Sequence, residues 1–440
     1  MPKVLIIGAG KSSSYLIDYM LQQAAAQQWT ITVADSQIAA AEARVQSHPY
    51  GVAIALEVGN HEEMDKQIAN HHLVISMLPA HMHLPVAKCC LAHGKHLVTA
   101  SYISDAMMQL NDEAAAKQLV FMNECGLDPG IDHMSAMEII HREQQKGHTI
   151  TSFESYCGGL VAPESNNNPW GYKFSWNPRN VILAGQSTAQ YLKNGINKYL
   201  PYHRLFGESC EIAIPGLGHF DGYANRDSLA YRSLYGLTAI ETMLRGTLRY
   251  SGFCEAWHLL VLAGYTDNSY TLQLRKQTTY AQLLDSFLAG TGDLMKRLET
   301  LMPGSQAAVA KLQWAGLLSN ELIPLESATP AEVLQHRLEQ CWLLEPNDRD
   351  MIVMWHRFVV HTPEGKKKIE STLVVKGENQ TYTAMAKTVG LPVAMAATAI
   401  LKGIIKTFGV VAPVNAPVYE PLLKELALHQ IIFTENISPA

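Results

Sequence analysis

Short apolar runs alternate with stretches of helical periodicity along the first 125 residues of the chain. The segments between these runs, such as residues 36–48, 84–94 and 106–117, repeat apolar residues at the spacing of one helix face. Strands that alternate with helices are typical of βαβ units, so the pattern predicts an α/β protein that begins with a doubly wound parallel sheet. The runs predicted as strands are residues 4–7, 29–35, 71–79, 95–101 and 117–125.

The pattern changes in the second part of the chain. Residues 150–160 and 351–377 have the composition of strands, and the second stretch contains a hairpin that turns at Pro363, Glu364 and Gly365. The residues between Leu237 and Leu344 show helical periodicity with few strand signals. This stretch is predicted to be an insertion into a mixed α/β domain. An alanine-rich helix that begins at residue 384 is expected to pack back against the first domain.

The stretch GAGKSSS directly after the first strand has the spacing of a nucleotide-binding loop. A P-loop would need a glycine five residues before Gly10, and that residue is Leu5. A dinucleotide loop needs a strand, then G-x-G-x-x-G, then a helix, and only the third glycine is replaced, by Ser13. A small serine is compatible with the close packing required there. The sequence therefore predicts a Rossmann dinucleotide site at Gly8, Gly10 and Ser13.

Asp35 ends the second predicted strand, about twenty residues beyond the glycine loop. A carboxylate at this position can bind the adenine ribose hydroxyls and repel a 2′-phosphate. The alternative is that Asp35 caps the helix that follows. Lys11, beside the loop, faces either the pyrophosphate or solvent.

Composition restricts the possible classes of protein. The 440 residues suffice for two or three domains, and we expect no apolar run as long as a membrane span and no secretory leader. Seven cysteines without a C-x-x-C pair indicate reduced thiols and a cytoplasmic location. The formal charge of −6 argues against nucleic acid as a partner. An anionic substrate would therefore be held by individual arginines.

Three further segments carry candidate chemistry. Asp128 and Asp132 follow a predicted strand, where open α/β sheets bind ligands, although Asp-Pro-Gly is also a strong turn sequence. Residues 154–180 combine aromatic, glycine and amide residues with little periodicity, which favours a loop that closes over substrate.

Candidate carboxylate clamps are Arg226, Arg245 and Arg249, since a guanidinium matches a carboxylate with two parallel bonds; structural ion pairs are the alternative.

The histidines do not form a recognisable metal motif. His71 and His72, and His81 and His83, have no third ligand at a suitable spacing, so no metal site is predicted. A cysteine nucleophile at Cys157 would need a positioned base that the sequence does not reveal.

Taken together, these blocks resemble the L-glutamate-forming saccharopine dehydrogenases. The similarity covers nearly the whole chain, is weakest in the middle helical region, and is most specific in CGGL-x-APE followed by NP-x-GYKFSW. The matching stretches are VISMLPAHMH, SYISDAMM, MNECGLDPGIDHM, SYCGGLVAPES, NPWGYKFSWNPR, ANRDS, LRGTLRY, YTAMAKTVGLP and GVVAP.

The resemblance implies a chain of three parts. These are a Rossmann domain (residues 1–125), a mixed α/β saccharopine-binding domain (126–236 and 346–383) with a helical insertion (237–345), and a C-terminal segment (384–440) that returns to the Rossmann domain. It also implies that glutamate condenses with α-aminoadipate semialdehyde to an imine, which hydride from the nicotinamide reduces to saccharopine. A homodimer is expected.

The resemblance also assigns residues to the site. Tyr102 and Asp128 are the candidates for handling the proton, although an iminium accepts hydride without an essential acid or base. The residues expected to contact substrate are Ser101, Tyr102, Asp128, Asp132, Cys157, Gly158, Arg226, Arg245, Gly246 and Thr247, with Ser175 and Trp176 completing the pocket. The residues expected at the cofactor are Gly8, Gly10, Lys11, Ser12, Ser13, Asp35, Ser76, Leu78, Leu127, Asp128, Pro129 and Ser175.

The choice of coenzyme and two alternative functions remain open at this point. Family members that use NADP tend to carry a basic residue at the position of Asp35, and a carboxylate repels a 2′-phosphate, so NAD is expected to be preferred over NADP. One alternative is an imine reductase of polyamine synthesis similar to carboxynorspermidine dehydrogenase. The other is a dinucleotide-sensing protein without turnover, which the arginine motifs disfavour.

Overall fold

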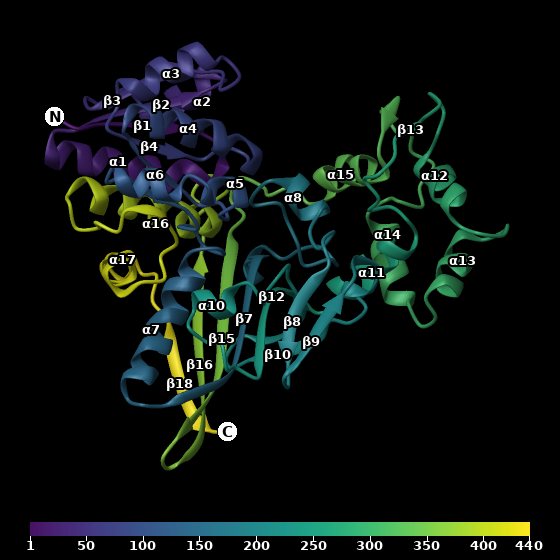
Figure 1. Ribbon diagram of the computed structural model, residues 1–440. Helices are drawn as coiled ribbons and strands as arrows, with labels where there is room; N and C mark the ends of the chain where they lie inside the picture. The colour runs from purple at the N-terminus through teal and green to yellow at the C-terminus, as the bar shows by residue number, and fades with distance from the viewer. The chain divides into compact units, whose positions relative to one another are not determined.

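The computed structural model describes all 440 residues, and they form two compact units. Unit 1 contains Met1–Thr149 and Leu373–Glu435, and unit 2 contains Ile150–Thr372 and Asn436–Ala440 (Figure 1). The three-part division expected from the sequence stays a prediction.

Unit 1 is built on a seven-stranded sheet whose paired strands are all parallel, as the alternating pattern predicted. The strand order is β17-β6-β5-β4-β1-β2-β3, so the chain reverses direction across the sheet between β1 and β4. Open sheets bind ligands at such a reversal, beyond the carboxyl ends of the strands. The strands are β1 (Lys3–Ile7), β2 (Thr30–Asp35), β3 (Gly51–Ala55), β4 (Leu73–Ser76), β5 (His96–Thr99), β6 (Val120–Met122) and β17 (Gly409–Val411).

Helices accompany this sheet along the chain, and the predicted alanine-rich helix is one of them. It is α16 (Ala384–Leu401), which packs closely on α1 (Ser14–Gln27) at Gly390, where an added Cβ would lie 3.1 Å from the backbone of Ser12 and Leu16. The other helices of unit 1 are α2 (Ile38–Val45), α3 (His61–Ala69), α4 (His83–His93), α5 (Asp105–Met108), α6 (Asn111–Ala116), α7 (Ile131–Gln145) and α17 (Ala416–Leu428).

Helix α16 also corrects one expectation, because it is long and apolar enough to cross a membrane. Within the structure, however, 83% of this stretch is buried in the protein. Its apolar character is therefore explained by its position as a core helix that packs on α1 and α17.

Unit 2 is built on a mixed sheet of nine strands. The central order is β10-β11-β12-β7-β15-β16-β18, and β8 pairs with β12 and β9. The predicted hairpin is confirmed, since β15 ends at Thr362 and β16 begins at Gly365. The strands are β7 (Thr149–Val161), β8 (Ala189–Lys193), β9 (Ile196–Leu200), β10 (Cys210–Ile214), β11 (Gly218–Ala224), β12 (Thr242–Tyr250), β15 (Asp350–Thr362), β16 (Gly365–Lys376) and β18 (Thr434–Pro439).

One sequence expectation fails in this sheet. Residues 242–250, expected to be helical, form the internal strand β12, which pairs with β7 on one side and β11 on the other. Of the segment 384–440 that is expected to return to the first domain, the part up to Glu435 belongs to unit 1, and Asn436–Ala440 belongs to unit 2, where β18 forms an edge of this sheet.

Most helices of unit 2 pack around a core rich in aromatic residues. Trp170, Tyr172 and Phe174 are 1%, 1% and 5% exposed, and their rings pack against Trp342 and Phe253. Residues 154–161 of the predicted closing loop belong instead to the strand β7, and the buried rings anchor the aromatic stretch in the core. Closure of the segment over substrate stays a prediction. The helices are α8 (Pro178–Ile182), α9 (Tyr202–Leu205), α10 (Tyr231–Leu234), α11 (Phe253–Leu262), α12 (Tyr280–Phe287), α13 (Leu294–Leu301), α14 (Gln306–Trp314) and α15 (Pro330–Cys341), together with the small strands β13 (Leu272–Gln273) and β14 (Ser327–Ala328).

Candidate active site

The glycine loop joins β1 to α1 through a short 3₁₀ turn, Lys11–Ser13. Gly8 has φ +109°, and a Cβ at this position would lie 3.0 Å from the carbonyl oxygen of Met77. Its N–H donates to the carbonyl of Ala34, at 2.8 Å. Conformation and close packing thus both require glycine at position 8.

Gly10 differs, because neither its conformation nor its neighbours require glycine. Its φ of −72° and ψ of −167° suit any residue, and an added Cβ would meet no atom within 4 Å. The second glycine of a dinucleotide loop keeps space open for the pyrophosphate. The open space at Gly10 fits a dinucleotide, and the side chain is absent where the ligand would approach.

Ser13 replaces the third glycine without disturbing the loop. Its side chain is buried, and its hydroxyl donates to the carbonyl oxygen of Gly10 at 2.7 Å. The hydroxyl therefore fastens the start of α1 to the loop, which a glycine could not do.

Asp35 also holds the loop. Its Oδ2 accepts from the N–H of Ala9 at 2.8 Å, and its Oδ1 accepts from the N–H of Gln37 at 3.0 Å. Gln37 occupies the N-cap position of α2 but makes no side-chain cap bond there. Asp35 lies two residues before this position, and its bond to the Gln37 N–H connects the loop to the start of the helix. The chain contains no lysine or arginine between Lys11 and Arg44.

A hydrogen-bonded chain links the carboxyl ends of β4 and β5. The two ring nitrogens of His83 lie 2.8 Å from the hydroxyl of Ser76 and 2.7 Å from that of Ser101. Burial, with a smaller effect of His81, lowers the pKa of His83 to about 4. The imidazole is therefore neutral near neutral pH, when one nitrogen donates and the other accepts. His83 thus joins a predicted cofactor residue to a predicted substrate residue.

The segment after β6 places several carboxylates at the carboxyl ends of the strands, where the hydrogen-bonded chain of His83 also lies. The Tyr102 hydroxyl donates to Asp128 Oδ1 at 3.2 Å, so the structure brings together the two residues expected to handle the proton. Buried Glu124 accepts from the N–H of Ile103 at 2.9 Å and contacts His133 Nε2 at 2.9 Å. Asp132 accepts from the N–H of Gly130 and so orders the start of α7.

The other cofactor candidates of unit 1 occupy the connections at this edge. Lys11 is exposed and Ser12 is half-buried in the turn before α1. The residues that follow β4 and β6 are Leu78, Leu127 and Pro129, and the peptide between Asp128 and Pro129 is cis.

Unit 2 presents a buried row of polar side chains on one face of its sheet. In the register of β12 with β7, Arg245 lies opposite Ser155 and Thr247 lies opposite Cys157. Paired residues share a face, so these four side chains lie on the same side. Tyr223 of β11 pairs with Thr247, and His356 of β15 contacts the Ser155 hydroxyl at 3.0 Å.

The arginines of this region have distinct environments. The Arg245 guanidinium is 7% exposed and lies 4.2 Å from the centre of the Tyr231 ring. Arg249 is buried against the rings of Tyr172 and Phe253, at 5.1 and 5.4 Å. Arg226 is exposed, with φ +47°, in the turn after β11. Arg245 and Arg249 are both buried on one face of β12; Arg245 lies opposite Ser155 in the polar row, whereas Arg249 packs among aromatic rings.

Gly158 and Gly246 lie on the opposite face of the same strands. A Cβ at Gly246 would overlap the ring of Tyr156, and one at Gly158 would lie 2.8 Å from the Cβ of Leu248. Packing therefore accounts for both glycines, and their predicted substrate contact stays a prediction. Ser175, expected at both cofactor and substrate, is buried beside the aromatic core.

Comparison with known proteins identifies the family. The family model described as saccharopine dehydrogenase NADP binding domain matches residues 4–122, and the saccharopine dehydrogenase C-terminal domain matches residues 126–432. The chain belongs to the saccharopine dehydrogenase family. It is an oxidoreductase of this family, as the resemblance implied.

Individual relatives agree with this family over the full chain. Saccharopine dehydrogenase [NADP(+), L-glutamate-forming] of Schizosaccharomyces pombe is 36% identical, with 99% of both chains covered. The apo saccharopine dehydrogenase (L-Glu forming) of Saccharomyces cerevisiae is 34% identical with a TM-score of 0.90 and 100% of both chains covered. Bovine mitochondrial alpha-aminoadipic semialdehyde synthase is 35% identical, but the chain spans only 47% of that longer protein.

The sequence pattern does not identify several residues that the structure places near the predicted site residues. The spacing of His83 after His81 suggests only a metal ligand and does not reveal that its ring reaches Ser76 and Ser101. The other residues are Glu124, His133, Ser155 and His356. His71 also has a structural role, since its ring lies 2.8 Å from the Thr32 hydroxyl.

Proposed function

We propose that this chain catalyses the reversible, NAD(P)-linked formation of saccharopine from glutamate and α-aminoadipate semialdehyde. The single observation that carries the proposal is the full-length similarity to proteins named for this reaction, on a chain that retains the dinucleotide loop. The polar row with Arg245 adds a site suited to a carboxylate.

The polar row in unit 2 is suited to an anionic substrate. Saccharopine carries three carboxylates, and the net charge of −6 means that fixed cations must hold them. The planar guanidinium of Arg245 packs over the Tyr231 ring, and a guanidinium matches a carboxylate with two parallel bonds. Arg226, Ser101, Cys157 and Thr247 are the further proposed contacts.

The condensation and reduction require little from protein acids and bases. The glutamate amine and the aldehyde join with loss of water to give an imine. Its reduction to the secondary amine adds a hydride to carbon and takes up one proton at nitrogen. The hydrogen-bonded pair of Tyr102 and Asp128 handles this proton in the proposal. Neutral His83 orients Ser101 through its bond to that hydroxyl.

The dinucleotide is held by the residues of the glycine loop. Gly10 leaves room for the pyrophosphate, and Asp35 faces the adenine ribose while its carboxylate also anchors Ala9. When bound, the nicotinamide supplies or accepts the hydride. Ser76, Leu78 and residues 127–129 line the carboxyl edge of the sheet beside it.

We infer further that NAD is preferred over NADP, although the yeast relatives are named for NADP(+). The inference rests on Asp35, whose carboxylate is fixed by two backbone N–H groups, and on the absence of lysine and arginine from residues 12–43. A 2′-phosphate would meet this fixed negative charge without a nearby cation from this segment.

Asp35→Asn tests this coenzyme preference, because an amide keeps an acceptor oxygen but removes the charge. We expect the preference for NADH over NADPH, measured as the ratio of kcat/KM, to fall about tenfold or more, which equals about 1.4 kcal/mol or more. Asp227→Asn, outside the dinucleotide loop, is the matched control. A wild-type enzyme that already prefers NADPH would contradict the inference.

The decisive experiment for the reaction is coenzyme oxidation with defined substrates. NADH and NADPH oxidation are followed with glutamate plus α-aminoadipate semialdehyde, and separately with the substrates of carboxynorspermidine dehydrogenase. Coenzyme oxidation with glutamate plus α-aminoadipate semialdehyde, and none with the other substrates, supports the proposal. Turnover with the polyamine substrates, or none with either set, would overturn it.

The cytoplasmic location and the homodimer stay predictions. None of the seven cysteines forms a disulfide in the structure, which supports a reducing location. Light scattering on the purified chain would test the homodimer.

A further inference from the structure

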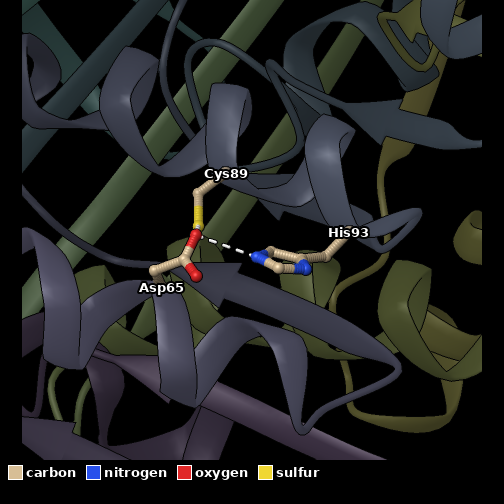
Figure 2. A group of neighbouring side chains, drawn as sticks. All are labelled: Asp65, Cys89 and His93. Carbon is tan, nitrogen blue, oxygen red and sulfur yellow. Dashed lines mark hydrogen bonds and ion pairs between the residues drawn. The ribbon is translucent and has the colours of Figure 1, made fainter.

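Three side chains that could bind a metal converge between α3 and α4 of unit 1. Figure 2 shows Asp65 from α3 facing Cys89 and His93 from α4. Asp65 Oδ1 lies 3.2 Å from Cys89 Sγ, which donates to it, and 2.8 Å from His93 Nε2. The three ligand atoms all lie within 4.8 Å of one another.

The cluster results from the spacing of residues on two adjacent helices. Cys89 and His93 are four residues apart on α4, so their side chains share one face of that helix. His61 and Asp65 have the same spacing on α3. His61, Asp65 and Cys89 also line one hollow of about 360 Å³, with Met64, Leu84, Pro85 and Lys88.

The donor set is that of a borderline transition metal. Thiolate, imidazole and carboxylate are the three side-chain ligands of zinc, whereas magnesium and calcium take oxygen ligands. With metal–ligand bonds of about 2.0–2.3 Å, neighbouring ligands of a tetrahedral zinc lie about 3.3–3.5 Å apart. The separations from Asp65 therefore need to widen by only a few tenths of an ångström.

We propose that Asp65, Cys89 and His93 bind a zinc-type divalent metal ion that bridges α3 and α4. The Cys89 sulfur lies at the buried base of the site, since this residue is 8% exposed. The side chains of Asp65 and His93 are 55% and 31% exposed and form its rim, so an ion can enter from solvent. The hollow lined by His61 has room for a fourth ligand.

The site is separate from the reaction proposed above. His83, at the start of α4, belongs to the hydrogen-bonded chain at the sheet edge, whereas Cys89 and His93 lie further along the helix. The ion would cross-link two helices that cover the sheet of unit 1. Binding to the folded state alone would then stabilise this unit.

Cobalt titration of the purified full chain tests the site. In metal-free buffer, Co²⁺ should produce the thiolate-to-cobalt charge-transfer absorption, and Zn²⁺ should displace it. Cys89→Ser should abolish this absorption, and His93→Gln should weaken Co²⁺ binding at least tenfold. Cys210→Ser, which removes an exposed thiol of unit 2, should bind as the wild type does.

Thermal unfolding gives a second readout that does not depend on activity. Zn²⁺ should raise the Tm of the wild type and of Cys210→Ser but leave that of Cys89→Ser unchanged. Unaltered NADH binding by Cys89→Ser shows that the variant is folded. Absence of cobalt–thiolate absorption from the wild type, or its persistence in Cys89→Ser, would overturn the proposal.

Discussion

Among single side chains, His83 couples structure to pH through its buried hydrogen bonds. It is 4% exposed and bridges the hydroxyls of Ser76 and Ser101, and burial lowers its pKa from 6.5 to about 4. The unfolded chain therefore binds a proton at a pH where folded His83 does not. The resulting stability is fully present above the unfolded pKa and is lost as the pH falls toward the folded pKa.

Replacing His83 with Gln should flatten this pH dependence. From these two pKa values, the free energy of unfolding of the wild type should fall by about 2 kcal/mol more than that of the variant between about pH 7 and about pH 5. Urea unfolding at the two pH values measures the difference. His219→Gln, at an exposed histidine of unit 2, should keep the wild-type dependence. Parallel curves for the wild type and His83→Gln would contradict the assignment.

At the scale of elements, the turn from β1 to α1 contains two glycines with different explanations: the backbone requires glycine at Gly8, whereas only a ligand would require it at Gly10. Gly8 has positive φ, and a Cβ there would crowd the backbone of Met77, whereas Gly10 has an ordinary conformation and open surroundings. The protein alone would tolerate a larger residue at position 10. The proposed pyrophosphate would account for glycine at this position.

Gly10→Val should therefore damage binding and spare stability. The valine side chain would occupy the space of the pyrophosphate, so we expect NADH affinity, read by fluorescence, to fall at least about tenfold. The Tm should stay close to that of the wild type. The matched control is Gly59→Val, at another glycine with open surroundings and no positive φ, which should bind NADH normally. Unchanged NADH binding by Gly10→Val would show that the loop does not hold the pyrophosphate.

Across the chain, the two units carry different parts of the proposed chemistry. The dinucleotide loop and Asp35 belong to unit 1, and the polar row with Arg245 belongs to unit 2. Substrate and coenzyme binding should then respond to different substitutions.

Arg245→Gln should raise the Michaelis constant for saccharopine about ten- to a hundredfold, because a charged hydrogen bond to a carboxylate contributes about 1.5–3 kcal/mol. Arg226→Gln should act in the same direction. Arg245→Lys should recover only part of the loss, since an ammonium lacks the planar fork. NADH binding should be unchanged in all three, and Arg275→Gln, at an exposed arginine of unit 2, is the control. An unaltered Michaelis constant in Arg245→Gln would make this arginine structural.

The sequence by itself determined the features that depend on neighbours along the chain. Alternating apolar runs specified five strands of the first sheet, and the glycine spacing located the turn at Gly8 and Gly10, because periodicity and backbone conformation are local properties. The apolar pattern does not predict the edge strand β3, because most of its residues are only partly buried and the apolar signal is therefore weak. The strand β12 is not recognisable in the sequence because one of its two buried faces carries Arg245 and Arg249, which interrupt an apolar pattern.

Only the tertiary structure decided which distant residues meet. It placed Trp170 in a core with Trp342, and it set Tyr156 against Gly246, although 172 and 90 residues separate these pairs in the sequence. It also brought Asp65 to Cys89 and His93, where the sequence indicated no metal site. Such contacts depend on how helices and strands pack, and a local pattern of apolar residues specifies the face that is buried without specifying the partner that covers it.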